Sequence, residues 1–338
     1  ATNWAPKGHE VAWDEYLVQP GDQEVVSAGD GAGNLRLTED KTTIYIEEKD
    51  FSYRLSKSTG QLVSAAGNDK KLLEKGPALN FWRAPLVNDM DGWSSGNFKN
   101  AAATPGMGKS RDNHWRTFGI DQLRSKLDFV EIRSVSDRQV VILVRSTMHT
   151  AHPDCAFEVN HRYRIESNGA IHIETKVIPH GKMPQWLPRV GLQLFLPLSL
   201  NHVEWYGRGP FETYPDRKTG AKTGIYQQTA EDQYVPYLVP QDHGNRTDVR
   251  WLRVTDNEGA GWMIYGDDLY NFSLHKYTQD NLERAAYSFQ LQEAEHLTLN
   301  IDHRVSGVGD TSKSTLQQYR VQPGVFEFTF SLVPVWQQ

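Results

Sequence analysis

The sequence predicts an all-β fold, a large antiparallel sandwich or barrel, on three observations. Short runs of alternating apolar and polar residues recur from Leu35 onward, as in half-buried strands. Helix is scarce, since only 278–285 has a helical pattern, with Thr278 as its N-cap. The 338 residues can bury a sizeable core, and an aromatic content of 11% fits a large β core or a protein that handles carbohydrate. Many strands with almost no helix indicate sheet packed on sheet.

The segment 170–177 is the clearest strand. Ile171, Ile173 and Val177 fall on one face and polar residues fall on the other. A Ser-Asn-Gly sequence at 167–169 supplies a hairpin turn just before it. Further strands are expected at 42–46, 51–55, 139–144, 157–165, 190–196, 251–254, 261–264, 272–274, 296–300 and 325–330.

The N-terminal part departs from this pattern. Residues 1–20 contain two short strand-like runs, 11–13 and 16–18, which are too few to fold alone. The stretch 21–34 is dominated by Gly, Asp and Ser and is predicted to be a linker. The main domain is therefore expected to span 35–338.

Two irregular segments are predicted to be loops with a function. Residues 205–217 combine four aromatic residues with two Arg, one Glu and one Asp, and their Gly and Pro residues disfavour helix and central strand. Aromatic faces beside hydrogen-bonding side chains often hold sugars; a tightly packed turn with internal Arg–carboxylate pairs is the alternative. The long stretch 88–113 follows the motif 83–89 directly, and loops of this length are usually functional or disordered.

Bulk properties exclude several classes of protein. The net charge of -6, without any Lys/Arg-rich block, argues against a nucleic-acid partner. No apolar run approaches the roughly 20 residues of a membrane helix. Cys155 is the only cysteine, so no internal disulfide forms. No signal-peptide pattern follows Ala1, so the chain is expected to start internally or after processing, and its compartment stays open.

Three motifs in a fixed order resemble the C-terminal part of the family 2 β-galactosidases. They are 83–89, 205–217 and 244–251, and the resemblance extends over 187–192 and 299–336. For the main domain it implies a supersandwich of the galactose-mutarotase type. For residues 1–20 it implies the last strands of an upstream immunoglobulin-like domain.

The resemblance also implies a domain without catalytic residues of its own. A retaining glycosidase needs two carboxyl groups about 5 to 5.5 Å apart, and in this family both belong to an upstream barrel domain. The sequence contexts of those carboxylates, Asn-Glu-Ser and Glu-Tyr-any-His, do not occur here, because Glu15-Tyr16 is followed by Leu-Val. The chain is thus expected to complete a site for terminal β-galactosides and to be inactive alone. Its implied partners are a carbohydrate substrate, the barrel domain or a large subunit, and further copies of the full enzyme. No cofactor is expected in this chain, and any cation of the full enzyme would lie in the barrel.

Substrate-binding residues are predicted within these motifs. In the family a loop reading Gly, aliphatic, Gly, Gly, Asp, Asp, Ser, Trp enters the sugar site. Residues 307–314 lack one Gly and the Trp, so this loop cannot supply stacking, and specificity for galactose is not implied. Lys313 suits an acidic or sulfated sugar, unless it points to solvent. The predicted set is Arg83, Asn88, Asp89, Arg208, Glu212, Tyr214, Asp216, Arg217, His243, Asn245, Asp310 and Lys313.

Several of these residues have a second interpretation. Arg83, Asn88 and Asp89 either bind sugar hydroxyls or a hard cation, or brace their own loop. Asp242 and His243 stand where the family has Glu and Asn. His243 either makes a pH-dependent contact or is an ordinary polar surface residue.

Metal and nucleotide sites have little support. The pair His149 and His152 lies between predicted strands with no further ligand nearby in sequence, so no zinc site is expected. The Gly-Arg-Gly run at 207–209 lacks the context of a dinucleotide fingerprint. Two functions remain as alternatives to the β-galactosidase part. One is a stand-alone epimerase of the mutarotase type, which uses a His and a carboxylate. The other is a non-catalytic carbohydrate-binding or structural module.

Overall fold

The computed structural model describes residues 2–16, 18, 33–89, 111–309 and 315–336. In this part, 17 strands form one continuous antiparallel sheet system, accompanied only by short helices. The expected all-β supersandwich is confirmed. The strands are β1 Arg36–Glu39, β2 Thr43–Glu48, β3 Phe51–Ser56, β4 Leu62–Gly67, β5 Lys70–Leu73, β6 Lys75–Asn80, β7 Arg124–Val135, β8 Gln139–His149, β9 Cys155–Glu166, β10 Ile171–Gly181, β11 Arg189–Leu196, β12 His202–Gly209, β13 Lys222–Thr229, β14 Arg246–Thr255, β15 Gly261–His275, β16 Leu297–Val305 and β17 Phe326–Val335. The α-helices are α1 Arg111–Thr117 and α2 Gln279–Arg284.

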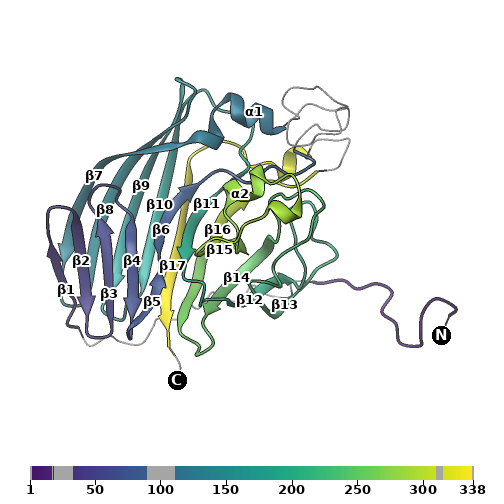
Figure 1. Ribbon diagram of the computed structural model, residues 1–338, viewed down its shortest axis with the longest axis horizontal. Coiled ribbons are helices and arrows are strands. Elements are labelled where there is room, and N and C mark those ends of the chain that lie inside the picture. The colour runs from purple at the N-terminus through teal and green to yellow at the C-terminus, as the bar shows by residue number, and fades with distance from the viewer. Residues whose placement is uncertain (1, 17, 19–32, 90–110, 310–314, 337–338) are drawn as a thin grey trace.

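The strands form two layers that face each other (Figure 1). One layer runs through β1, β2, β3, β4, β6, β11 and β16, with β5 paired to β4. The other runs through β7, β8, β9, β10 and β17. The layers are in close contact, because the Tyr53 hydroxyl in β3 donates to the carbonyl of Gly169 at 2.7 Å. A Cβ on Gly60, beyond β3, would lie 2.3 Å from Val144 in β8.

The long strand β15 joins the two layers along one side. Its first residues, from Gly261 to Gly266, pair with β17, and its last residues, from Asn271 to His275, pair with β16. Its other edge pairs with β14, which continues the sheet through β12 to β13. The segments that follow β12 and β15 therefore lie at one end of these strands, near the start of β14, whereas the turn between β14 and β15 lies at the other end.

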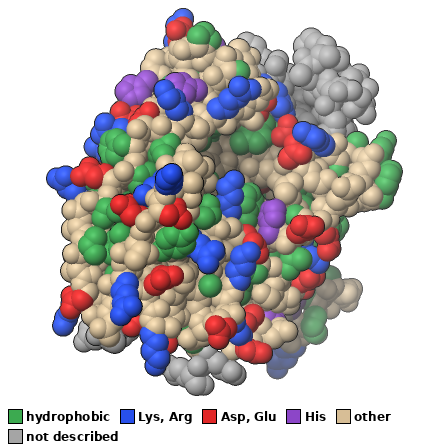
Figure 2. All heavy atoms as spheres, turned by 60° about the vertical axis from the view of Figure 1, so that its left-hand side comes forward, with side chains coloured by type: hydrophobic (Ala, Val, Ile, Leu, Met, Phe, Trp, Pro, Cys, Tyr) green, Lys and Arg blue, Asp and Glu red, His purple; other side chains and the backbone are tan. Residues whose placement is uncertain are grey.

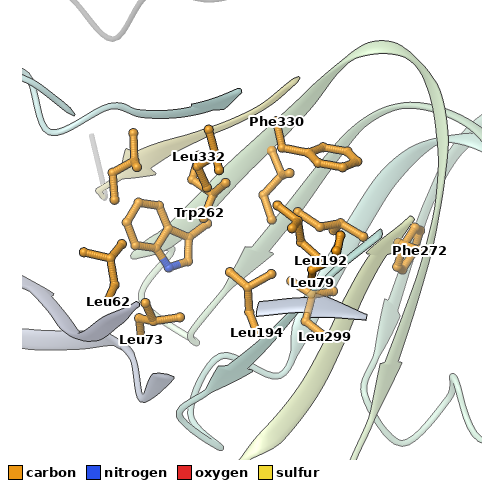
Figure 3. Close-up of a cluster of buried hydrophobic side chains, with 14 of the residues drawn as sticks. Leu62, Leu73, Leu79, Leu192, Leu194, Trp262, Phe272, Leu299, Phe330 and Leu332 are labelled. Atoms are coloured by element: carbon orange, nitrogen blue, oxygen red, sulfur yellow. The ribbon is translucent and has the colours of Figure 1, made fainter. Parts of the chain in front are cut away.

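The core fills the space between the layers. In β9 buried and half-buried residues alternate without interruption over 12 residues, as in a strand with one face on the core. Trp262 of β15 packs beside Leu62, Leu73 and Leu332, which come from both layers (Figure 3). Its indole N–H donates to the carbonyl of Leu72 at 2.8 Å, so the one polar atom of this buried side chain is satisfied.

All strands expected in the main domain overlap observed ones, and 261–264 and 272–274 are parts of β15. The helix is also confirmed, because the Thr278 hydroxyl accepts from the backbone N–H of Asn281 at 3.1 Å. The strands that sequence reasoning missed are mostly short or at an edge. For example, β7 pairs with β8 alone among the described strands and is largely exposed, so it has no apolar periodicity.

Three expectations about irregular segments need correction. Residues 205–209 are not loop but the end of β12, because their glycines permit close packing; a Cβ on Gly209 would lie 2.7 Å from Tyr226. The runs 11–13 and 16–18 contain no strand among their described residues. The stretch 88–113 ends in the first turn of α1. Most of that stretch, 90–110, and most of the expected linker, 19–32, lie outside the described residues.

The surface carries no marked charge asymmetry on the face shown in Figure 2. Acidic and basic side chains are interspersed there, with hydrophobic side chains between them. Where positive and negative side chains lie within a Debye length of each other, their electrostatic fields largely cancel at physiological salt. The helices within the described ranges are too short and too polar to span a bilayer.

We predict that Trp262→Ala strongly destabilises the chain, because it empties a site at the junction of both layers. The expected loss in free energy of unfolding is about 3 to 5 kcal/mol, measured by urea denaturation. Phe289→Ala is the matched control, since that side chain is 81% exposed; its expected effect is within about 0.5 kcal/mol. Equal losses in both variants would contradict the assignment of Trp262 to the core.

Candidate functional site

A cleft of about 310 Å³ gathers four distant parts of the chain. Its walls come from residues 86–88, the turn at 214–217, the segment 237–242 and Val308. Residues 86–88 and 214–217 belong to the sequence motifs 83–89 and 205–217, and Val308 belongs to the 307–314 loop, whereas 237–239 was not singled out by sequence. Of the predicted binding residues, Asn88, Tyr214 and Arg217 line this cleft directly.

Arg83 and Asp89 lie behind the cleft wall and hold it in place. Two guanidinium nitrogens of Arg83 donate to the Asp89 carboxylate, each at 3.1 Å. Arg83 also donates to the carbonyls of Ser306 and Gly307, at 2.8 and 3.2 Å. Both charged side chains are at most 1% exposed. The pair therefore braces the motif 83–89 against the chain that follows β16.

Asp216 and Asn88 fix the beginning of the 307–314 loop. The Asp216 carboxylate accepts the backbone N–H groups of Val308 and Gly309, at 2.9 and 2.7 Å. The Asn88 amide donates to the carbonyls of the same two residues, each at 3.4 Å. A Cβ at Gly307 would lie 2.4 Å from an Asp216 oxygen, so glycine is needed there. Asp310 and Lys313 lie outside the described residues, directly beyond this anchor.

Glu212, Arg217 and Tyr237 form a second anchored group at the cleft. Glu212 accepts from both Arg217 and Tyr237, and also from the backbone N–H of Gly244 at 2.9 Å. Arg217 is half exposed and lies over the Tyr214 ring, 5.6 Å from its centroid. Burial and the Glu212 carboxylate raise the pKa of Tyr237, which keeps its hydroxyl a donor. The cleft thus presents a guanidinium whose charge is already balanced.

A fully buried charge cluster lies beneath the cleft floor. Asp242 accepts from the Tyr214 hydroxyl at 3.1 Å and from Arg189 at 2.9 Å. Arg189 also lies 3.4 Å from Asp302 of β16. Burial, reinforced by the Asp242 charge, raises the pKa of Asp302 to about 7, although Arg189 opposes the shift. Sequence reasoning missed Arg189 and Asp302; an acid among the apolar residues of β16 was the available signal.

The remaining predicted residues do not line the cleft. Arg208 pairs with Asp248 at 2.6 Å and lies at the β12–β14 edge. Asn245 is buried and its amide donates to the carbonyl of Thr213 at 2.7 Å. His243 lines a separate, smaller cavity.

This arrangement can bind and orient a ligand. The described carboxylates around the cleft are all engaged: Asp89 and Asp242 with arginines, Glu212 with Arg217 and Tyr237, and Asp216 with backbone N–H groups. None of these is set up as a free general acid or base. Among the described residues, His149 and His152 included, no three His, Cys, Asp or Glu side chains gather as metal ligands do.

The sequence of this chain was matched to known proteins, and the matches point to one family. The family model for the beta-galactosidase small chain matches residues 47–332. A β-galactosidase of Priestia megaterium is 29% identical over 308 residues, which cover 91% of this chain and 28% of that protein. One from Vibrio vulnificus is 30% identical over 319 residues, 91% of this chain and 29% of that protein. The chain thus spans less than a third of the length of these relatives.

Among solved structures, the chain aligns with one protein of similar length and with part of a longer one. A GalM/aldose epimerase homologue from C. elegans aligns over 90% of this chain and 99% of its own, with a TM-score of 0.47 and 9% identity. An α-mannosidase from Enterococcus faecalis aligns over 89% of this chain and 30% of its own, with a TM-score of 0.48 and 9% identity.

We predict that Asp302 makes stability depend on pH. An acid whose folded pKa is raised to about 7 from its ordinary value of 3.8 retains its proton in the folded state across that interval. The unfolded chain releases it, so this group's contribution to stability falls as pH rises from about 4 to 7. The free energy of unfolding of the wild type minus that of Asp302→Asn should therefore decrease over this range. The expected slope is on the order of 1 kcal/mol per pH unit, measured by urea denaturation. A constant or rising difference would mean that Arg189 keeps Asp302 ionised.

Proposed function

Because the chain belongs to the beta-galactosidase small-chain family, we propose that it is the C-terminal part of a β-galactosidase. In this proposal the cleft completes a site for terminal β-galactosides, and the catalytic carboxylates lie on a barrel domain or large subunit. The observation that carries the proposal is the cleft itself. It joins residues 86–88 of the motif 83–89, the turn at 214–217 and the start of the 307–314 loop into one wall, while the described carboxylates around it are all engaged.

The chemistry of the cleft supports a neutral sugar as its ligand. Tyr237 supplies an aromatic face beside Tyr214, Arg217 supplies a donor and the side-chain oxygen of Asn88 supplies an acceptor at the wall. Since Glu212 balances the charge of Arg217, the described wall has no excess charge that selects an acidic ligand. Asp310 and Lys313 continue from the Asp216 anchor, and we place them at the mouth of the shared site. Lys313 there would extend the range of ligands to acidic or sulfated sugars.

The other predicted residues receive supporting roles in this proposal. Arg83, Asp89, Glu212 and Asp216 position the loops that contact sugar, rather than contacting it themselves. The organisation of the chain is part of the same proposal. Residues 1–20 complete an upstream immunoglobulin-like domain, 21–34 connect, and 35–338 form the supersandwich. The full enzyme is a homo-oligomer.

A stand-alone epimerase is less well supported at this site. A mechanism of the mutarotase type needs a His and a carboxylate facing one sugar. The cleft wall, as far as the structure describes it, contains no histidine. The other alternative is a binding or structural module without any catalytic partner. The mixing assay described next distinguishes it from the proposed role.

We predict that the chain alone does not hydrolyse a chromogenic β-galactoside and that activity appears after a polypeptide carrying the barrel is added. Arg217→Ala should then lower kcat/KM by about tenfold or more, because a charged hydrogen bond contributes about 1.5 to 3 kcal/mol. Arg284→Ala is the control, since this arginine is exposed on α2 and pairs only with Asp280 among described residues.

Each outcome of this assay has a distinct meaning. Hydrolysis by the chain alone would refute the assignment of catalysis to another domain. Sugar binding by the chain with no activity after mixing would instead indicate a module that has no catalytic role. An unchanged kcat/KM in Arg217→Ala would remove this residue from the site.

A further inference from the structure

A second cavity lies on the other side of the segment that forms one cleft wall. Gln241 and Asp242 face the cleft, whereas His243 faces this cavity, whose volume is about 140 Å³. Its other walls come from the turn after β13, from the end of β15 and the residues that follow it before α2, and from Glu293 beyond α2. It shares no lining residue with the cleft among the described residues. The volume is several times the roughly 10 to 15 Å³ that one water requires.

His275 is the unusual residue of this cavity. It is 2% exposed, and neither ring nitrogen has a hydrogen-bond partner among the described residues. Buried polar groups in folded proteins are nearly always hydrogen-bonded. Burial, together with the nearby His243, Arg189 and Arg246, holds the pKa of His275 well below its ordinary value. The ring is therefore neutral near pH 7 and offers one donor and one acceptor.

His243 adds a second neutral imidazole. Its Nδ1 lies 2.9 Å from the carbonyl oxygen of Gln241, which can only accept, so Nδ1 carries the hydrogen and Nε2 is left as an acceptor. Burial lowers the pKa of His243 as well. The rings of His243 and His275 meet edge to face, with centroids 4.6 Å apart.

The remaining walls are aromatic, and their charge is locally balanced. The rings of Tyr234 and Tyr277 lie 5.7 Å apart, centroid to centroid. Lys276, the one cation among the described lining residues, is paired with Glu231 at 3.0 Å and Glu293 at 2.9 Å. An anion would meet two carboxylates and no free cation here. A neutral ligand with hydroxyl groups and an apolar face matches both the imidazoles and the tyrosines.

We propose that this cavity is a second carbohydrate site that binds a single neutral sugar ring. The tyrosines contact the C–H face of the ring, the Nε2 acceptor of His243 bonds one of its hydroxyls, and the His275 ring rotates to bring its enclosed, unpartnered nitrogens to another. The inference goes beyond the proposed function, because no residue of the cavity lines the cleft and no catalytic partner is required.

The test follows histidine side chains by NMR in the ¹⁵N-labelled chain during titration with galactose and with glucose. The His275 ring signals, assigned with His275→Gln, should shift in a saturable way with at least one of the two sugars. Sodium galacturonate, an anionic sugar of similar size, should leave them in place. Tyr277→Ala should weaken the affinity by about tenfold, the size expected for loss of an aromatic contact. Tyr277→Leu provides a second variant in case the first disturbs folding, which the dispersion of the amide spectrum reports.

Arg217→Ala separates the two sites, since Arg217 lines the cleft and is not among the described residues that line this cavity. An unchanged His275 titration in that variant supports the second site. Loss of the shifts in Arg217→Ala would place the sugar in the cleft and overturn the proposal. Equal shifts with galacturonate, or no shift with either neutral sugar at 100-fold molar excess or more, would overturn it as well.

Discussion

Pairing of buried charge is the constraint on which the rest of the site depends. Arg83 and Arg189 are both fully buried, and a buried guanidinium is tolerated only when carboxylates and carbonyls surround it. Arg83 satisfies this need with Asp89 and the carbonyls after β16, and Arg189 does so with Asp242 at 2.9 Å, while Asp302 lies 3.4 Å from it. The loops that form the cleft therefore cannot separate without leaving a charge uncompensated.

This constraint explains why the sequence identifies the motifs but does not tell which of their residues line the cleft and which brace it. The β architecture follows from local alternation, and the α2 cap follows from Thr278 alone. By contrast, Arg83 meets Ser306 across more than two hundred residues, which no local pattern encodes. For residues 205–209 the local pattern predicted a loop, but they form the end of a strand. Their glycines, Gly207 and Gly209, permit close packing of that strand rather than a turn. Lining residues such as Asn88 and bracing residues such as Asp89 look alike in sequence, since both are polar residues of one loop.

The two cavities illustrate how one segment serves two surfaces. Residues 241–245 contribute Gln241 and Asp242 to the cleft and His243 to the other side. Glu212 fixes this segment through the backbone N–H of Gly244, whose φ of +71° suits glycine. The chain covers less than a third of the length of its relatives. Under the proposed function it would contribute to the larger enzyme a wall of defined shape and balanced charge, and another domain would supply the reacting groups.

The most direct test of this account is a crystal structure of the chain assembled with a barrel-bearing polypeptide and a bound galactoside. The account predicts the sugar between the barrel carboxylates and the cleft, with Arg217, Tyr237 or the 310–314 loop within hydrogen-bond distance of it. A galactoside held entirely by the barrel, with the cleft turned away from it, would contradict the claim that this chain completes the site.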